Sequence, residues 1–263
     1  MLGTGWRIYK ETRKKHDLLF NVYLMRPIAA QVVALVAPSR VSPNQVTLLN
    51  LAIFLVAAAL LVALPTYQGG LIAIAVLELS YCLDCVDGML ARHKKIASKE
   101  GHLFDFFTDE LKAVLLASVL AVRLYRMGGL ALAMSTPIAI VTWPAGSPAF
   151  LFAGIVGAVV LASAISLTNF IRRPELSGRE SSVEAHYETV VAEKPKSIVG
   201  KLASLATTFL RFLNHYPSHI WIFAALGRLD AFFWIYVAIN ALYLARGWLG
   251  LLLRFGRFPK AQG

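Results

Sequence analysis

The sequence predicts an all-α protein, a polytopic membrane helical bundle with six transmembrane helices preceded by an N-terminal interfacial amphipathic helix. Three observations support this: 57% of the 263 residues are hydrophobic, mean hydropathy is +0.62, and the apolar residues form long runs. Several runs approach the roughly 20 apolar residues that cross a bilayer as a helix. The net charge of +11 comes from Lys and Arg just outside the runs, which indicates contact with membrane lipids and not with nucleic acid.

Residues 1–42 are predicted to lie along the membrane surface. Basic residues between Arg7 and Lys15 are followed by an apolar-rich stretch from Leu18 onward, a mixture typical of helices that lie in the interface with the apolar side down. A signal peptide is not indicated, because no apolar core and cleavage site follow the charges.

Residues 43–255 form the predicted transmembrane catalytic domain, and residues 256–263 form a basic tail. Gly and Pro interrupt the apolar run between Gly128 and Pro148, which indicates an interfacial or re-entrant piece. Residues 172–201 are polar and are predicted to form a cytoplasmic loop. The expected spans are 46–64, 71–87, 104–125, 149–171, 202–226 and 230–253.

The distribution of Lys and Arg predicts an orientation. The N-terminal arm, the link from Arg92 to Lys99, the 172–201 loop and the C-terminal tail are basic, whereas the opposite ends of the spans carry few basic residues. By the positive-inside rule, both termini of this integral membrane protein lie on the cytoplasmic side, together with the acidic cluster described next.

Four carboxylates stand at the ends of two neighbouring apolar runs. Asp84 and Asp87 are three residues apart and Asp105 and Asp109 are four apart, so on helices each pair shares a face. Two antiparallel helices joined by the link 93–100 would bring the pairs together. A carboxylate at the bilayer centre costs about 2.5–3.5 kcal/mol on insertion scales, so the cluster needs compensation. Hard divalent cations such as Mg²⁺ supply it, because they prefer oxygen ligands.

The spacing of this stretch resembles the signature of the CDP-alcohol phosphotransferases, D-x2-D-G-x2-A-R-x8-G-x3-D-x3-D. The resemblance is sharp here and over the approach at residues 43–47, and only architectural elsewhere. It implies that a CDP-linked donor is cleaved between its phosphates, that CMP leaves, and that an alcohol hydroxyl attacks to form a phosphodiester. All eight fixed positions are present: Asp84, Asp87, Gly88, Ala91, Arg92, Gly101, Asp105 and Asp109.

The resemblance assigns roles to the four carboxylates. Asp84, Asp87 and Asp105 are implied to be metal ligands, and Asp109 is implied to share metal binding and to act as the general base on the acceptor hydroxyl. The expected cofactors are two divalent metal ions, Mg²⁺ or Mn²⁺, because two such ions can clamp a diphosphate and stabilise the attacking and leaving oxygens.

Six residues are expected at the nucleotide site. Gly88 and Ala91 would let the donor approach the helix closely, Gly101 would keep room for the nucleotide, and Arg92 would face a phosphate. The approach Pro-Asn-x-x-Thr adds Asn44 and Thr47 as contacts of the CDP group. A simple helix cap formed by Ser42 or Asn44 explains that approach equally well.

Two cations are candidates for the acceptor site. Lys112 follows Asp109 by three residues, where it could equally balance the acidic face. Arg211 lies within the fifth expected span, where an ionisable residue indicates function, and a phosphate on the acceptor is its expected ligand. Asn169, Arg172 and Arg173 end the fourth span as headgroup anchors or, alternatively, acceptor ligands.

Other residues that can bind metals are interpreted structurally. His215 and His219 share a face, but no carboxylate accompanies them, so they are expected to line an acceptor cavity or an interface. Cys82 and Cys85 form a C-x2-C pair without a second pair at zinc spacing, and they are expected to be packing residues.

Three alternative interpretations fit less well. The pattern of UbiA-type prenyltransferases is N-x3-D-x3-D followed by a second acidic motif far downstream. This chain has D-x2-D in the first cluster and no second cluster after Asp109. An ion-coupled transporter could use the carboxylates, but it predicts inverted halves with matching broken helices. Carboxylates that merely pair with Lys and Arg would leave the Gly and Ala positions unexplained.

The expected donor is a CDP-linked lipid, CDP-diacylglycerol, with an alcohol acceptor that the motif does not specify. The alternative is a CDP-choline or CDP-ethanolamine type of donor with a lipid acceptor. A homodimer is expected from the resemblance only.

Overall fold

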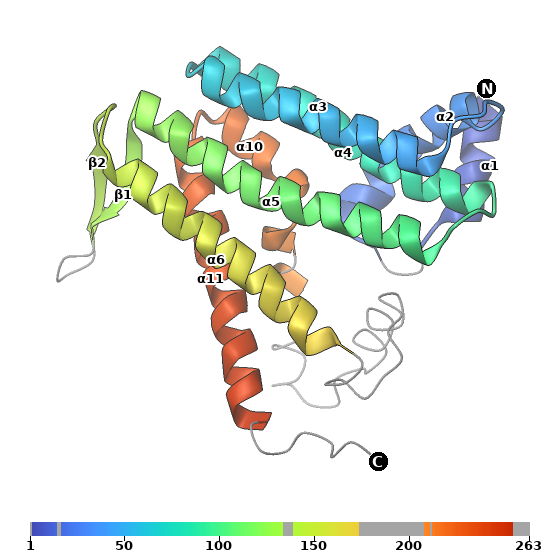
Figure 1. The fold of residues 1–263 in the computed structure, drawn as a ribbon. Helices are drawn as coiled ribbons and strands as arrows, with labels where there is room; N and C mark the ends of the chain where they lie inside the picture. Colours follow the sequence, from blue (N-terminus) through green and yellow to red (C-terminus); the bar gives the residue numbers. More distant parts are fainter. Residues whose placement is uncertain (1, 15–16, 134–138, 174–207, 211, 255–263) are drawn as a thin grey trace.

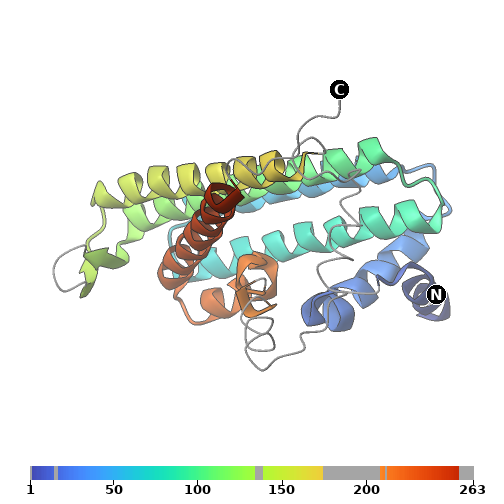
Figure 2. The same ribbon diagram turned by 90° about the horizontal axis from the view of Figure 1, so that it is seen from below.

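The computed structural model describes residues 2–14, 17–133, 139–173, 208–210 and 212–254. Three long helices lie side by side, α3 (Pro43–Ala63), α4 (Tyr67–His93) and α5 (Lys99–Met127) (Figure 1). Helix α6 (Ala149–Arg172) runs beside α5, and α11 (Leu229–Arg254) packs against α6 and α5. Figure 2 shows α3, α5 and α6 on one side of α4, and the shorter helices α1 (Leu2–Thr12), α2 (Arg26–Val36) and α10 (Ile220–Ala225) on the other.

Local capping determines where the three long helices begin. Ser42 forms a capping box with Gln45 at the start of α3, and Pro43 occupies the first turn. Thr66 accepts from the Gly69 N–H at the start of α4, and Ser98 accepts from the Gly101 N–H at the start of α5. The cap at Ser98 ends the short link after His93, so α5 turns back beside α4.

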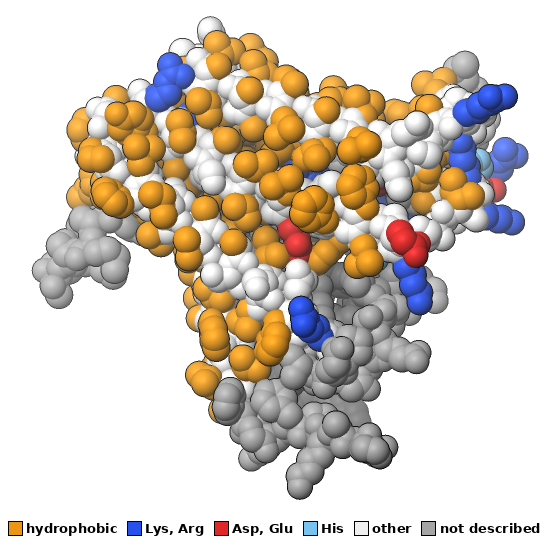
Figure 3. Space-filling view, in the orientation of Figure 1, with side chains coloured by type: hydrophobic (Ala, Val, Ile, Leu, Met, Phe, Trp, Pro, Cys, Tyr) orange, Lys and Arg blue, Asp and Glu red, His pale blue; other side chains and the backbone are white. Residues whose placement is uncertain are grey.

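Within the described parts of the chain, four helices are long and apolar enough to cross a membrane: α3, α4, α6 and α11. Figure 3 shows hydrophobic side chains spread over the face formed by α3, α5 and α6, as expected for a surface in contact with lipid. Helix α5 covers the third expected span but is not among these four, and it carries charged residues from Lys99 to Arg126, with Lys112 near its centre. The six spans of the prediction are therefore confirmed only in part.

The fifth expected span, 202–226, is wrong as a single helix in its described part. Residues 212–214 are helical, His215 breaks the helix, and a 3₁₀ turn, η2 (Tyr216–Ser218), leads into α10. Pro217 lacks a backbone N–H and therefore favours this break. Residues 202–207 of the expected span lie outside the described residues.

The prediction of an all-α protein is corrected between α5 and α6. Strands β1 (Gly129–Ala133) and β2 (Ala139–Trp143) form an antiparallel hairpin in place of the expected interfacial or re-entrant piece. Gly128 ends α5 with a φ of 74°, and the β-branched sequence Ile-Val-Thr favours a strand. Trp143 packs edge-to-face on Trp234, whose indole N–H donates to the Leu130 carbonyl and ties the hairpin to α11.

The N-terminal segment forms α1, a π-helical turn, η1 (Asn21–Met25), and α2, instead of one amphipathic helix. Ile8 and Tyr9 of α1 are buried with residues of α2 and of the C-terminal half of α4. The same cluster contains Cys82 and Cys85, which are unbonded and buried. Both cysteines are thus packing residues, as predicted, and the interfacial position of the segment stays a prediction.

Candidate active site

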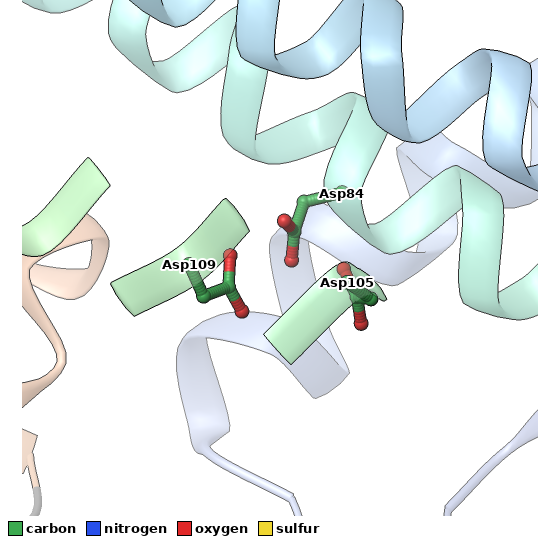
Figure 4. Close-up of side chains that lie close together, drawn as sticks. All are labelled: Asp84, Asp105 and Asp109. Atoms are coloured by element: carbon green, nitrogen blue, oxygen red, sulfur yellow. The ribbon is translucent and has the colours of Figure 1, made fainter. Parts of the chain in front are cut away.

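Helices α4 and α5 bring three of the four predicted carboxylates together. One oxygen from each of Asp84, Asp105 and Asp109 lies within 4.8 Å of the other two. Figure 4 shows Asp84 extending from α4 toward Asp105 and Asp109 on α5. The four-residue spacing on α5 puts Asp105 and Asp109 on one face of that helix, which is why both reach Asp84.

Asp87 lies apart from this group, toward helix α3. Its Oδ2 accepts a hydrogen bond of 2.7 Å from the Thr47 hydroxyl, and Asp87 is 3% exposed. Thr47 was expected to contact a nucleotide, but in the structure its hydroxyl is directed at Asp87 and at the Pro43 carbonyl. Thr47 therefore fixes the position of a carboxylate, whatever else it contacts.

Asp84 is held by two residues that the sequence analysis did not identify. Asn50 Nδ2 donates to Asp84 Oδ1 over 2.8 Å, and the Ser80 hydroxyl lies 2.5 Å from Asn50 Oδ1. Ser80 thereby orients the amide so that its N–H₂ faces the carboxylate. Asn50 and Ser80 are buried in apolar helices, and a polar residue inside an apolar run was the signal that could have revealed them.

Lys112 supplies the positive charge closest to the carboxylates. Its Nζ lies 2.7 Å from Asp84 Oδ1 and 2.7 Å from Asp109 Oδ1, and the residue is 2% exposed. Lys112 therefore balances the acidic face, one of the two roles considered from the sequence. Its assignment to the acceptor stays a prediction.

The cluster has unused capacity for a cation. Asp105 Oδ1 is buried and has no hydrogen-bond partner in the described part of the chain. Burying an unpaired carboxylate oxygen is costly, so one ammonium does not compensate this cluster. Closely grouped carboxylate oxygens are the ligands that Mg²⁺ and Mn²⁺ prefer, and the residues therefore fit a divalent metal ion.

The expected nucleotide residues lie at the start of α3, the end of α4 and the start of α5. A Cβ added at Gly101 would meet Asn44 Oδ1 at 3.3 Å, so the glycine leaves room for this amide. Since Ser42 is the cap of α3, the Asn44 side chain is not needed for capping. A Cβ at Gly88 would face the Arg92 guanidinium at 3.4 Å. Arg92 Nε donates to the Thr12 carbonyl over 3.2 Å.

A polar network borders the cluster on the side of the N-terminal segment. The Tyr81 hydroxyl, three residues before Asp84, donates to Asn21 Oδ1 over 2.6 Å and lies 2.8 Å from His215 Nε2. Asn21 Nδ2 in turn donates a hydrogen bond to Asp17 Oδ1, and Asp17 forms an ion pair with Arg26. This network joins the start of the chain to the turn before α10, next to a proposed metal ligand.

The two histidines have different surroundings. His215 bonds to Tyr81 and to the Ser218 hydroxyl, whereas His219 lies among the rings of Phe212, Phe223 and Phe232. Neither ring nitrogen of His219 has a hydrogen-bond partner among the described residues. His215 thus belongs to the polar border of the cluster.

The described structure does not bring the other residues considered for the acceptor to the carboxylates. Arg211 lies outside the described residues. Asn169 donates to Glu110 over 2.8 Å, and Arg173 stands with both at the polar end of a groove of about 530 Å³ between α5 and α6. The groove walls are otherwise mainly apolar, which suits the headgroup-anchor interpretation of this end of α6.

Comparison with known proteins gives the family. No curated protein matches the sequence significantly. The family model described as CDP-alcohol phosphatidyltransferase matches residues 40–213, more than half of the chain, and this range contains all four carboxylates. Members of this family are divalent-metal-dependent membrane enzymes that transfer a phosphate-containing group from a CDP-alcohol to an acceptor in phospholipid synthesis. The chain therefore belongs to the CDP-alcohol phosphatidyltransferase family of transferases for substituted phosphate groups.

Proposed function

We propose that this enzyme transfers the substituted phosphate of CDP-diacylglycerol to the hydroxyl of an alcohol, releasing CMP and forming a phosphodiester. The observation that carries the proposal is the group formed by Asp84, Asp105 and Asp109, whose oxygens lie within 4.8 Å of one another and of which Asp84 belongs to a helix apolar enough to cross a membrane. Carboxylates in such surroundings are costly unless they bind cations, and bound cations attract a diphosphate.

The four aspartates would hold two divalent ions, Mg²⁺ or Mn²⁺. When bound, these ions would neutralise the diphosphate and stabilise the charge that develops on the departing CMP. The protein contributes the fixed positions of the ligands: Asn50 holds Asp84, and Thr47 holds Asp87. Positioning and charge neutralisation are the main demands of phosphoryl transfer.

Asp109 is proposed as the general base. Its side chain is 49% exposed, whereas that of Asp84 is 17% exposed, so an acceptor hydroxyl can approach Asp109 more easily. Lys112 bonds to Oδ1 of Asp109, and Oδ2 is then the oxygen that would accept the hydroxyl proton. Lys112 and Arg211 are retained as proposed acceptor ligands.

The nucleotide is proposed to bind along the cytoplasmic ends of α3, α4 and α5. Gly88, Ala91 and Gly101 would allow close approach of the donor, and Arg92 and Asn44 would supply polar contacts. Thr47 is retained as a member of this set through its bond to Asp87. The basic segments support an orientation with both termini and this site on the cytoplasmic side. A homodimer in the membrane completes the proposal.

The decisive experiment measures CMP release by the purified protein in nanodiscs with Mg²⁺ or Mn²⁺. CDP-diacylglycerol is supplied with one alcohol at a time (glycerol phosphate, inositol, inositol phosphate or serine), and a parallel series uses CDP-choline or CDP-ethanolamine with diacylglycerol. We expect CMP with CDP-diacylglycerol and one acceptor, and its loss on chelation. CMP only in the parallel series would reverse the assignment of donor and acceptor. Absence of both CMP and CDP binding would contradict the proposed function.

A further inference from the structure

The ammonium of Lys112 occupies a position that a metal ion would need. It lies 2.7 Å from both Asp84 Oδ1 and Asp109 Oδ1. Asp84 and Asp109 are also two of the three residues whose oxygens come together within 4.8 Å. A metal ion that binds both of these Oδ1 atoms must displace the ammonium, whereas an ion held by the other carboxylate oxygens of the group leaves it in place.

The charge of the cluster favours one divalent ion without substrate. Four ionised carboxylates and one ammonium have a formal net charge of −3, which one divalent ion reduces to −1. A second ion would reverse the sign of the cluster and would lie beside the buried ammonium, which is 2% exposed and shielded little by water. New negative charge must enter for the second ion to bind well, and the diphosphate of a CDP-linked donor brings it.

The surroundings allow the ammonium to leave without losing the position of Asp84. Asn50 Nδ2 donates to the same Oδ1 atom over 2.8 Å, and Ser80 holds Asn50. Asp84 thus keeps one donor when Lys112 moves. The lysine side chain is flexible, so after leaving Asp84 its ammonium would stay near Asp109, where the acceptor is expected.

We propose that Lys112 is a built-in substitute for the second metal ion. In the nucleotide-free enzyme its ammonium bridges Asp84 and Asp109, and the cluster binds one divalent ion. The second ion enters together with the diphosphate and displaces the ammonium. This role for Lys112 rests on the proposed function, because the diphosphate is what makes the exchange favourable.

The test counts bound Mn²⁺ by electron paramagnetic resonance on the full-length protein in detergent, with and without CDP. We expect the wild type to bind one ion without CDP and two with it. Lys112→Gln removes the tethered charge and should bind two ions in both conditions. Lys112→Arg retains the charge and should behave as the wild type. Lys99→Gln removes an exposed lysine from the same helix and serves as the matched control.

The wild-type counts keep the proposal falsifiable if Lys112→Gln does not fold. Two tightly bound ions in the wild type without CDP, or one ion in folded Lys112→Gln without CDP, would overturn the role of Lys112 and leave the proposed function standing. No bound ion in the wild type in either condition would overturn the proposed function itself, and the role of Lys112 with it.

Discussion

Helix α5 carries two buried cationic side chains, Lys112 and Arg123, whose partners differ in kind. Lys112 and Arg123 are each 2% exposed, and they lie about 16 Å apart along the helix axis. Lys112 contacts the carboxylates of Asp84 and Asp109. Among the described residues, Arg123 donates only to backbone carbonyls, those of Leu61, Leu64 and Thr66.

The partners distinguish a cation beside the proposed metal ligands from one that supports the fold. The carbonyls that receive Arg123 belong to the end of α3 and the turn to α4, where a helix leaves its last carbonyls without partners. A positive charge at this end also complements the helix dipole. Burial and charge alone would make both residues functional candidates in a membrane protein, and only their contacts separate them.

The largest effect is expected from Asp109→Asn. Removing the proposed base should lower the rate of CMP release by about 10²- to 10⁴-fold, because an amide does not accept the acceptor proton. Thermal stability should change little, since the side chain is 49% exposed. Glu110→Gln changes the neighbouring carboxylate, which bonds to Asn169, and is the control that should stay active. Near-wild-type turnover in Asp109→Asn would remove the assignment as base.

Arg123→Met should give the opposite result, a loss of stability without a chemical defect. Carbonyls at the end of α3 would lose their charged donor, so we expect a decrease of roughly 3 kcal/mol in the free energy of unfolding. A thiol-reactive fluorogenic dye can follow unfolding, because Cys82 and Cys85 are free and buried.

Arg126→Gln is the matched control for Arg123, since Arg126 is exposed and donates to one carbonyl of the described structure, that of Val62. Arg126→Gln should lower the free energy of unfolding by less than Arg123→Met does. If Arg123→Met folded but lost its turnover per molecule, the assignment of Arg123 to the fold and not to the chemistry would be wrong.

Asn50→Ala should weaken metal binding by about 10- to 100-fold, since residues that hold a metal ligand in place commonly contribute this much. Asn50 is the donor from α3 that fixes Asp84. Titration with Mn²⁺ measures the effect directly. Asn240→Ala removes a buried amide of α11 that donates to the Tyr236 carbonyl, and it should keep wild-type affinity. Equal affinities in the two variants would contradict the role of Asn50.

The smallest effect is expected from Tyr81→Phe, which removes the hydroxyl between Asn21 and His215. Loss of these neutral hydrogen bonds should lower stability by about 1 kcal/mol and turnover only modestly. Tyr67→Phe removes an exposed hydroxyl that donates to the Ala225 carbonyl and should be nearly silent. A large loss of turnover in Tyr81→Phe would make the polar network part of the chemistry and not only its border.

The sequence by itself determined the carboxylates, the helices that carry them and the link between those helices. Residue spacing sets which side chains share a helical face, and Ser or Thr before a helix sets where it begins, so these features depend on nearby residues only. The same local patterns did not exclude a continuous helix through His215 and did not reveal the hairpin after Gly128.

Only the tertiary structure decided the partners of the buried polar groups. Asn50 meets Asp84 across 34 residues, Lys112 meets Asp84 across 28, and Arg123 meets the Leu61 carbonyl across 62. Such pairings depend on how helices are rotated against one another, which hydrophobic periodicity constrains weakly where apolar residues surround a membrane helix on all sides. That rotation turned Asp87 toward Thr47 and Lys112 into the acidic cluster.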